Sequence, residues 1–538
     1  MRFLTQASFG PNEADIARLT DIGYAAWIDE QQALPATSHR AHWEARDREF
    51  KALVPAQSAG EEQVHESFWK QALNGPDQLR LRTVFALSQI FVISLADNGV
   101  ANNPRAVAAW LDMLGDKGLG NYRELLESVS RHPMMGVYLS HLRNQRADTR
   151  TGRVPDENYA REVMQLFSIG LVELNEDGSA RTVGGQAVDT YGPADIAGLA
   201  RVFTGWSWNC PNWPDNGCFF NGSAGGDADP DRSFNAMLGY PQYHSAEEKR
   251  FLGTTIAAQT LPDPNASLKT ALDALAAHAN VGPFIGRQLI QRLVTSNPSP
   301  TYVRDVARAF ADNGKGVRGD LKAVVKAVLM HPEARVQSDT AGKLREPVLR
   351  LSAFLRAFPH RSDTGHWRVG NTDNPATSLG QTAMRSPSVF NFYRPGYVPP
   401  GTQAAAAGLV APEMQITHES SVAGYVNYMR DNLSAGVGSS NGVVGGVTLN
   451  RRDLQGDYTA QLALAGDAAA LVDHVLARLT YGDTAALRTE IVAAVNSIAI
   501  PALNGTGSNQ AQIDNARRNR VNAALLLTLV APEFIVQQ

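Results

Sequence analysis

Helical spacing of apolar residues is the feature that most constrains what this chain can fold into. Apolar side chains recur every three or four positions through most of the sequence, whereas the alternating patterns typical of strands are scarce. The clearest helical stretches are 12–27, 78–94, 121–129, 195–203, 268–278, 283–294, 302–311, 321–330, 348–358, 460–479, 484–498 and 511–530. A short run at 442–449 fits a minor hairpin. The sequence therefore predicts a mainly α fold, an irregular multi-helix array with at most minor β-hairpins.

Two long stretches interrupt the helical pattern. Residues 206–243 are rich in Trp, Cys and Asp, and residues 360–413 are dense in Pro, Gly and Asn. Loops of this length inside a compact chain are often functional, and we expect both to wrap around the helices. They separate three predicted helical blocks, 1–205, 244–359 and 414–538, which can still pack as one unit.

Composition and charge exclude several classes of protein. Hydrophobic residues make up 43% and charged residues 19%, an ordinary globular balance. The net charge of −4 provides no positive field for nucleic acid or an anionic membrane. The longest apolar run, 83–96, is too short for a bilayer span of about 20 residues. No charged and apolar leader opens the sequence, and we expect that an export signal has been removed from it.

The two cysteines, Cys210 and Cys218, lie close together in the first loop. A structural zinc would need two further ligands nearby, and none is evident. Their spacing predicts a local disulfide, which favours an oxidising, exported location; two reduced thiols are the alternative.

The segment 155–170 is the most informative part of the sequence. Asp156 is placed to cap a helix there and Gly170 to end it. Helical spacing then aligns four polar side chains on one face, namely Asn158, Arg161, Glu162 and Gln165. One interpretation is a surface helix with a Glu157–Arg161 pair. The other is a stripe lining a cleft, in which Glu157 and Glu162 supply acid–base chemistry or a metal ligand and Arg161 holds an anion.

The first loop carries two further candidate groups. Three tryptophans, Trp206, Trp208 and Trp213, either stack on a sugar or apolar ligand or fill the core beneath the loop. Alternate carboxylates in a Gly-rich turn suggest either a calcium site or a solvated acidic turn, and they are Asp227, Asp229 and Asp231.

Polar candidates also lie near the ends of the two loops. His244 precedes an apparent capping box of Ser245 and Glu248, which predicts a helix start with His244 at its mouth, either structural or reaching a cleft as a catalytic group. The second loop mixes aromatic residues with three polar side chains, Arg385, Asn391 and Arg394. Either the loop is a rigid segment that seals the helices, or these three side chains point into a polar site.

The sequence lacks the common catalytic and cofactor motifs. The sequence contains no G-x-S-x-G, H-E-x-x-H, P-loop, strand-associated G-x-G-x-x-G or C-x-x-C-H pattern. No nucleotide, haem or zinc motif is therefore present, and the cofactor is left open, with calcium as the one suggestion.

Short motifs spread along the chain resemble one bacterial family. They are Arg2-Phe3-Leu4-Thr5-Gln6-Ala7-Ser8-Phe9-Gly10-Pro11, Glu157-Asn158-Tyr159-Ala160-Arg161-Glu162, Thr204-Gly205-Trp206, a predicted helix ending at Gly253, and Ala531-Pro532-Glu533-Phe534. Over nearly the whole chain the sequence resembles the domain-of-unknown-function family numbered 1800. The resemblance implies an exported protein with an exported sulfatase/phosphatase-like partner of the family numbered 1501. Many members have Glu-Leu-His where this chain has Gln165-Leu166-Phe167, so any role of that histidine would be missing here.

Two functions follow as expectations, both in the periplasm or outside the cell. The first is an enzyme or enzyme subunit acting on an envelope or extracellular polymer, with the stripe of 157–165 facing the Trp loop across a cleft. The second is a non-catalytic binding or assembly factor at the envelope that presents the Trp loop to a glycan or a partner protein. A stripe that faces solvent, with the tryptophans buried, would favour a scaffolding role.

Overall fold

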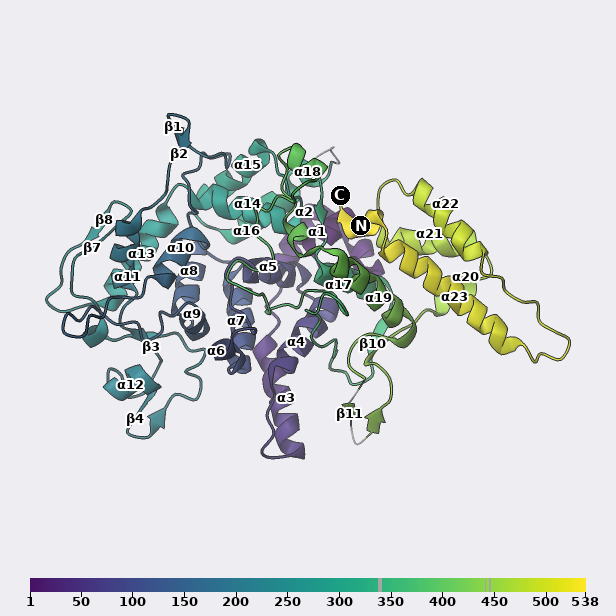
Figure 1. Ribbon diagram of the computed structural model, residues 1–538, viewed down its shortest axis with the longest axis horizontal. Coiled ribbons are helices and arrows are strands. Elements are labelled where there is room, and N and C mark those ends of the chain that lie inside the picture. The colour runs from purple at the N-terminus through teal and green to yellow at the C-terminus, as the bar shows by residue number, and fades with distance from the viewer. Residues whose placement is uncertain (337–340, 441, 445–446) are drawn as a thin grey trace.

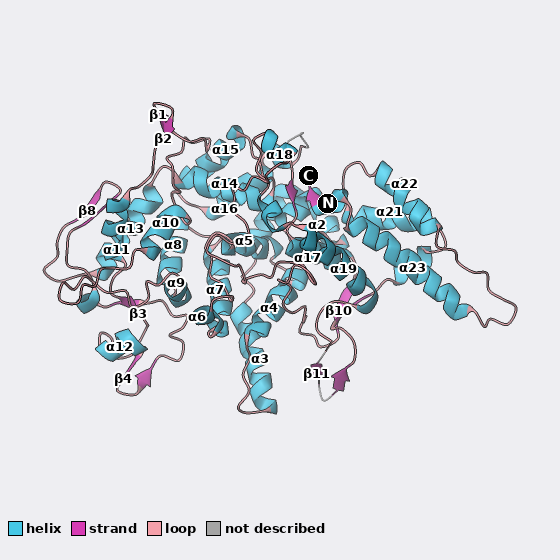
Figure 2. Cartoon of the chain, in the orientation of Figure 1, coloured by secondary structure: helices cyan, strands magenta, loops and turns pink. Residues whose placement is uncertain are grey.

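Helices build most of the architecture, and the strands pair in twos (Figures 1 and 2). The computed structural model describes residues 1–336, 341–440, 442–444 and 447–538. The prediction of a mainly α fold with minor hairpins is confirmed.

The helices before the Trp/Cys loop are α1 (Arg2–Ala7), α2 (Glu13–Ala33), α3 (His39–Leu53), α4 (Glu61–Asn74), α5 (Gln78–Ser88), α6 (Asn98–Ala101), α7 (Pro104–Lys117), α8 (Tyr122–Arg131), α9 (Pro133–Tyr138), α10 (Asn158–Gln165) and α11 (Pro193–Val202). The predicted cap of α2 is confirmed, since Asn12 accepts the N–H of Asp15 at 2.7 Å.

The helices that follow are α12 (Asn216–Asn221), α13 (Pro264–Ala277), α14 (Val281–Leu293), α15 (Pro300–Ala311), α16 (Leu321–Met330), α17 (Pro347–Ala357), α18 (Gln403–Ala406), α19 (Glu419–Ala435), α20 (Thr459–Leu464), α21 (Ala468–Leu479), α22 (Ala485–Asn496), α23 (Gln510–Leu529) and α24 (Pro532–Ile535). Short 3-10 turns are η1 (Pro241–Tyr243), η2 (Pro332–Ala334) and η3 (Pro412–Ile416). In Figure 1, α20–α23 form an arm at the right, and the earlier helices fill the centre and left.

The described strands form seven antiparallel pairs. They are β1 (Thr182–Val183) with β2 (Gln186–Ala187), β3 (Trp206–Ser207) with β6 (Leu238–Gly239), β4 (Ser223–Ala224) with β5 (Asp227–Ala228), β7 (Lys249–Phe251) with β8 (Thr254–Ile256), β9 (Lys343–Leu344) with β14 (Val536–Gln537), β10 (His360–Ser362) with β13 (Leu454–Gly456), and β11 (Gly442–Val444) with β12 (Val447–Leu449). The last pair confirms the hairpin predicted at 442–449, whose residues 445 and 446 lie outside the described residues.

Two large clusters of buried apolar side chains form the core. The first packs the N-terminal helices against α13–α16 and includes Trp110 and Leu289. The second includes Phe68 of α4, Phe354 of α17 and Leu525 of α23, one from each predicted helical block. The three blocks therefore share a core, while their boundaries stay a prediction.

The two chain ends meet at Tyr481. The Arg2 guanidinium lies 5.6 Å from the centre of the Tyr481 ring, and the Gln538 N–H donates to the Tyr481 hydroxyl at 3.3 Å. Pairing of β14 with β9 ties the C-terminus to the segment that begins at Lys343. This segment carries buried charges that matter for the site described below.

Two predicted helices have different limits in the structure. The helix predicted at 78–94 ends at Ser88, where the Gln89 N–H bonds the Ala86 carbonyl in a tighter turn. The stretch predicted at 460–479 is two helices, because Asp467 accepts the N–H of Ala470 and so starts a new one.

The prediction of a helix from Ser245 to Gly253 was wrong. The chain forms the β7–β8 hairpin there, with Leu252 and Gly253 in its turn at φ of 49° and 73°. Two consecutive positive φ values suit a two-residue hairpin loop. Along β7, Lys249 and Phe251 are buried and Arg250 is exposed, so strand alternation outweighs the apparent capping box.

No helix in the described ranges combines the length and hydrophobicity needed to cross a bilayer.

Candidate functional site

The helix of the most informative motif, α10, differs at its start from the prediction. Its N-cap is Glu157 rather than Asp156, whose Oδ1 accepts the Asn158 N–H at 2.8 Å. The helix also ends earlier than predicted, at Gln165 with Leu166 as its C-cap, and the chain makes a separate turn at Gly170, where φ is 73°. A Cβ at Gly170 would lie 2.8 Å from the Phe284 ring, so this close approach requires glycine.

The polar stripe of α10 has mixed surroundings. Asn158 is exposed, and Arg161 and Glu157 lie 3.8 Å apart with both side chains 47% exposed. Glu162 is buried, and its Oε2 has no hydrogen-bond partner among the described residues. Burial raises the pKa of Glu162, and Arg161 offsets part of this rise. Gln165 is half-buried and lines a cavity.

The three tryptophans do not roof that cavity. Trp206 is buried and donates its Nε1–H to the Val202 carbonyl at 3.2 Å, so it fills the core. Trp208 is half-buried, and Trp213 is 44% exposed with its Nε1–H bonded to the Gly239 carbonyl at 3.0 Å. The residues that line the cavity beside Gln165 include none of these three tryptophans, so this cavity is not the predicted cleft between the stripe and the indole rings.

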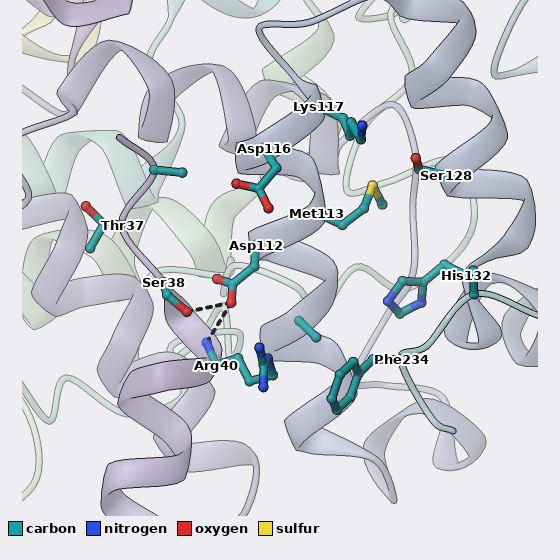
Figure 3. A pocket seen from close by; sticks show the side chains of 13 residues that line it. Thr37, Ser38, Arg40, Asp112, Met113, Asp116, Lys117, Ser128, His132 and Phe234 are labelled. Carbon is teal, nitrogen blue, oxygen red and sulfur yellow. Dashed lines mark hydrogen bonds between the residues drawn. The ribbon is translucent and has the colours of Figure 1, made fainter. Parts of the chain in front are cut away.

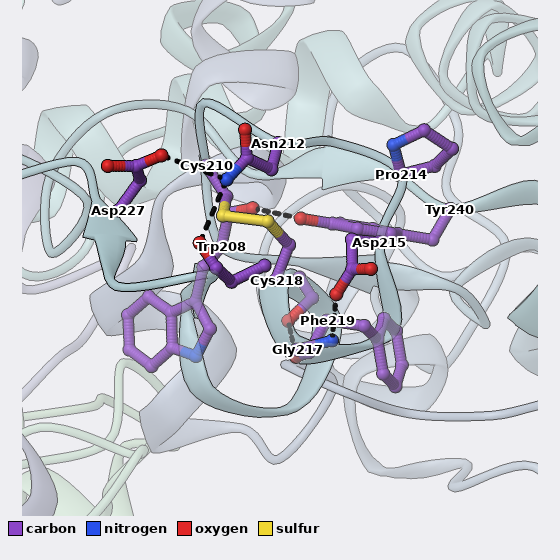
Figure 4. The surroundings of a disulfide bond; sticks show 12 residues. Trp208, Cys210, Asn212, Pro214, Asp215, Gly217, Cys218, Phe219, Asp227 and Tyr240 are labelled. Atoms are coloured by element: carbon purple, nitrogen blue, oxygen red, sulfur yellow. Dashed lines mark hydrogen bonds between the residues drawn. A yellow bond between two sulfur atoms is a disulfide. The ribbon is translucent and has the colours of Figure 1, made fainter.

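A disulfide joins Cys210 and Cys218, as predicted (Figure 4). The two Cα atoms are 5.6 Å apart, and both residues are buried against Phe219 and Tyr240. The Tyr240 hydroxyl donates to the Trp208 carbonyl at 2.7 Å, which ties the loop to this small core.

The three acidic residues of the loop point to different partners. Asp227 accepts from Asn212 at 3.2 Å, and Asp231 pairs with Arg105 at 2.6 Å. Asp229 accepts the Asp231 N–H at 2.8 Å in a local turn. No group of three or more His, Cys, Asp or Glu in the described part of the chain is arranged to hold a metal ion, so the geometry gives the calcium prediction no support.

His244 is buried and anchors two segments. Its Nδ1–H donates to the Thr204 carbonyl at 2.8 Å, and its Nε2 lies 3.0 Å from the Ser267 hydroxyl. Burial lowers its pKa to about 4, so the ring is neutral at ordinary pH. These contacts fit the structural interpretation of His244.

The three polar candidates of the second loop have separate environments. Arg385 forms ion pairs with Asp373, at 2.8 Å, and with Glu61. Asn391 is buried at φ 63°, and its Nδ2 has no partner among the described residues. Arg394 is exposed, lies 4.5 Å from the centre of the Phe390 ring and lines the same cavity as Gln165. The fold thus brings together two predicted residues, Gln165 and Arg394, from segments more than 200 positions apart.

We call this hollow the arginine cavity. It has a volume of about 390 Å³ and lies between the end of α10, α14 and the loop at 389–396. Its polar wall consists of Gln89, Gln165, Arg287, Gln288, Gln291, Arg292 and Arg394. Phe284 and Phe390 contribute aromatic surface. None of the described lining residues is acidic. Arg287 and Arg394 are exposed, whereas Arg292 is buried and interacts electrostatically with Glu346 and Glu413 behind the wall.

Several lining side chains keep unused hydrogen-bonding groups. Arg287 is exposed and has no hydrogen bond or ion pair within the described residues. Gln288, Gln291 and Arg292 are at most 7% exposed, yet Gln288 Nε2, Gln291 Oε1 and Arg292 Nε lack partners among those residues. Buried polar groups are normally satisfied, so these three atoms set the inner wall of the cavity apart from an ordinary core.

A buried ionic network lies directly behind the cavity. Lys343 and Glu413 form an ion pair at 2.8 Å with side chains at most 2% exposed. Lys343 Nζ also donates to the Arg292 carbonyl at 2.9 Å. Gln89 Nε2 donates to a carboxylate oxygen of Glu346 at 2.5 Å, and Arg292 donates to the Gln89 carbonyl at 2.9 Å. The network fixes the inner wall of the cavity.

Burial controls the electrostatics of this network. It raises the pKa of Glu413, which Lys343 partly lowers again, and it lowers the pKa of Arg292. Lys343 opposes the rise in the pKa of Glu413, and Glu346 and Glu413 oppose the fall in the pKa of Arg292. These opposite charges let the charged side chains stay buried.

One comparison with known proteins finds a match across nearly the whole chain. The family model described as "Protein of unknown function (DUF1800)" matches residues 2–536. The chain belongs to this family. No curated protein and no solved structure matches it.

In this DUF1800 protein, position 167 is part of the core. Phe167 is fully buried, with its ring centre 5.4 Å from that of Phe91 and 6.2 Å from that of Tyr159. The position at which the family resemblance led us to expect a histidine thus has no contact with solvent here.

Most residues of the arginine cavity were not predicted from the sequence. The missed residues are Gln89, Arg287, Gln288, Gln291 and Arg292, with Lys343, Glu346 and Glu413 behind them. One signal was present, since Arg287, Gln288, Gln291 and Arg292 form a second polar face on an otherwise apolar helix.

Proposed function

We propose that this DUF1800 protein is exported and binds an anionic segment of an envelope or extracellular polymer in the arginine cavity. The observation that carries the proposal is the charge at the mouth of the cavity: Arg287 and Arg394 are exposed lining residues without an ion-pair partner among the described residues, and no described lining residue is acidic. Guanidinium groups suit sulfate, phosphate and carboxylate because their planar donors match these oxygens.

The chemistry of the lining favours binding over catalysis in this cavity. The described lining residues are Gln, Arg, Gly, Pro and apolar side chains. None offers a nucleophile or a group that exchanges protons near neutral pH. Catalysis by Glu157, Arg161, Glu162 or His244 stays a prediction.

Location and partner belong to the same proposal. The Cys210–Cys218 disulfide is typical of proteins in an oxidising compartment, which supports a periplasmic or secreted location. An exported sulfatase/phosphatase-like partner, expected from the family resemblance, would act on polymers that carry anionic esters, which suit the guanidinium groups of Arg287 and Arg394.

The direct test is binding of dextran sulfate, with neutral dextran as the uncharged probe. Arg287→Gln with Arg394→Gln removes two exposed cavity charges, neither of which has an ion-pair partner among the described residues. We expect at least tenfold weaker binding, about 1.4 kcal/mol, and a shallower salt dependence. The matched control, Arg517→Gln with Arg518→Gln, makes the same charge change on exposed positions of α23.

The result has a clear counter-outcome. Equal loss of binding in both double variants would show that binding depends on net charge and not on the cavity. Full binding by Arg287→Gln with Arg394→Gln would rule out the arginine cavity as the binding site. Calorimetry at two salt concentrations distinguishes these cases.

A further inference from the structure

A second cavity of about 410 Å³ lies between the start of α3, the face of α7 and the end of α8 (Figure 3). Figure 3 shows Asp112 and Asp116 on one side, with His132 across the hollow. The charged lining residues are two acids and two bases, Asp112, Asp116, Arg40 and Lys117. Its wall therefore has no net charge, unlike the arginine cavity.

His132 presents a buried, unused donor to this cavity. Its Nδ1 accepts the Met134 N–H at 3.2 Å, so the proton of the neutral ring sits on Nε2. The residue is 4% exposed, and Nε2 has no hydrogen-bond partner in the described structure. Burial lowers the pKa of His132 far below its ordinary value, so the donor stays neutral.

Asp116 supplies a free acceptor on the opposite wall. It is exposed and has no hydrogen bond or ion pair with any described residue. Asp112 differs, because its carboxylate accepts from the Ser38 hydroxyl at 2.7 Å and from the His39 N–H at 2.5 Å. Asp112 therefore holds the start of α3, and Asp116 is left for a ligand.

The remaining wall limits the chemistry of the ligand. Arg40 pairs with Glu44 at 2.9 Å and lies 4.8 Å from the centre of the Phe234 ring, so its charge is already partly compensated. Met113 and Phe234 add apolar surface beside the polar groups. An anion would meet two carboxylates here, and a strong cation would meet Arg40 and Lys117.

We propose that this cavity binds a neutral polyhydroxyl ligand, one or two sugar units, which accepts a hydrogen bond from His132 Nε2 and donates one to Asp116. A sugar hydroxyl both donates and accepts, and its C–H faces suit the apolar part of the wall. The volume lies in the range of about 300–1,000 Å³ typical of small-ligand sites. The proposal does not depend on the arginine cavity.

The test is saturation-transfer NMR with the methyl glycosides of glucose, galactose, mannose and N-acetylglucosamine. At least one is expected to give a signal with the unmodified protein. Asp116→Ala removes the acceptor, and His132→Asn removes the Nε2 donor while its side-chain oxygen can still cap Met134. Each variant should weaken binding at least fivefold.

Two controls assign the signal to this site. Asp514→Ala removes an aspartate from α23, outside the cavity, and should leave binding within twofold. The Arg287→Gln/Arg394→Gln variant should also keep glycoside binding, and a loss there would move the signal to the arginine cavity. Absence of signal from all four glycosides would overturn the proposal, as would unchanged binding by Asp116→Ala. Thermal melts verify folding, and if His132→Asn melts early, Asp116→Ala decides alone.

Discussion

The buried Lys343–Glu413 pair gives the sharpest energetic prediction. Lys343→Met removes the ammonium group that lies 2.8 Å from Glu413 and leaves a carboxylate that is 2% exposed. Breaking such a pair from one side costs about 3–5 kcal/mol, because the remaining charge is buried without compensation. We therefore expect a loss of this size in the free energy of unfolding.

The loss depends on pH in a defined direction. Burial already holds the pKa of Glu413 above its ordinary value of 4.5, and removing Lys343 raises that pKa further. A carboxyl with a raised pKa binds more protons in the folded state, so the variant loses stability as pH rises through the raised value. The difference from the unmodified protein should be larger at pH 8 than at pH 5.

Denaturant unfolding of three proteins tests this reasoning. The double variant Lys343→Met with Glu413→Leu removes both charges and should recover most of the loss. A deficit of about 1 kcal/mol should remain, because the bond from Lys343 Nζ to the Arg292 carbonyl is also gone. A single variant costing less than about 1 kcal/mol, or an identical cost at both pH values, would refute an uncompensated buried charge.

Two further substitutions test local features of α10. Gly170→Ala should destabilise the protein by about 1–3 kcal/mol. The loss should exceed that of the control Gly152→Ala, because the two glycines have φ of 73° and 74° but only Gly170 has the Phe284 ring within 4 Å of an added Cβ. Equal denaturant midpoints of the two variants would contradict the role of that contact. Glu162→Gln should raise the thermal midpoint at pH 8, because burial disfavours the charged carboxylate that the substitution removes. Near pH 4.5 the midpoint should not rise, because the raised pKa leaves the Glu162 carboxyl largely neutral there. A lower midpoint at pH 8 would show that the charge is stabilising.

The sequence predicted the local features that depend on neighbouring residues. The Asn12 cap and the Cys210–Cys218 disulfide are both confirmed. Each depends on groups a few positions apart, so a short segment of sequence contains all the residues that interact. The error at 245–253 has the same origin, since the segment showed a capping box and not the pairing of β7 with β8.

The candidate site was predicted in part. Gln165 and Arg394 line the arginine cavity, whereas Trp206 and His244 are buried in other surroundings. Periodicity gives the direction of a side chain relative to its own helix, but not which other segment covers that face. Only the packing of α14 and the second loop against α10 places the two residues together.

Helical spacing alone thus determined that this chain is mainly α, because backbone hydrogen bonding and burial of an apolar face are decided within each segment. Tertiary structure alone decided that Arg287 and Arg394 line one hollow that has no acidic lining residue among those described, because the two arginines come from segments about 100 positions apart. Electrostatic energy depends on distance in space, and the sequence does not specify that distance until the core has formed.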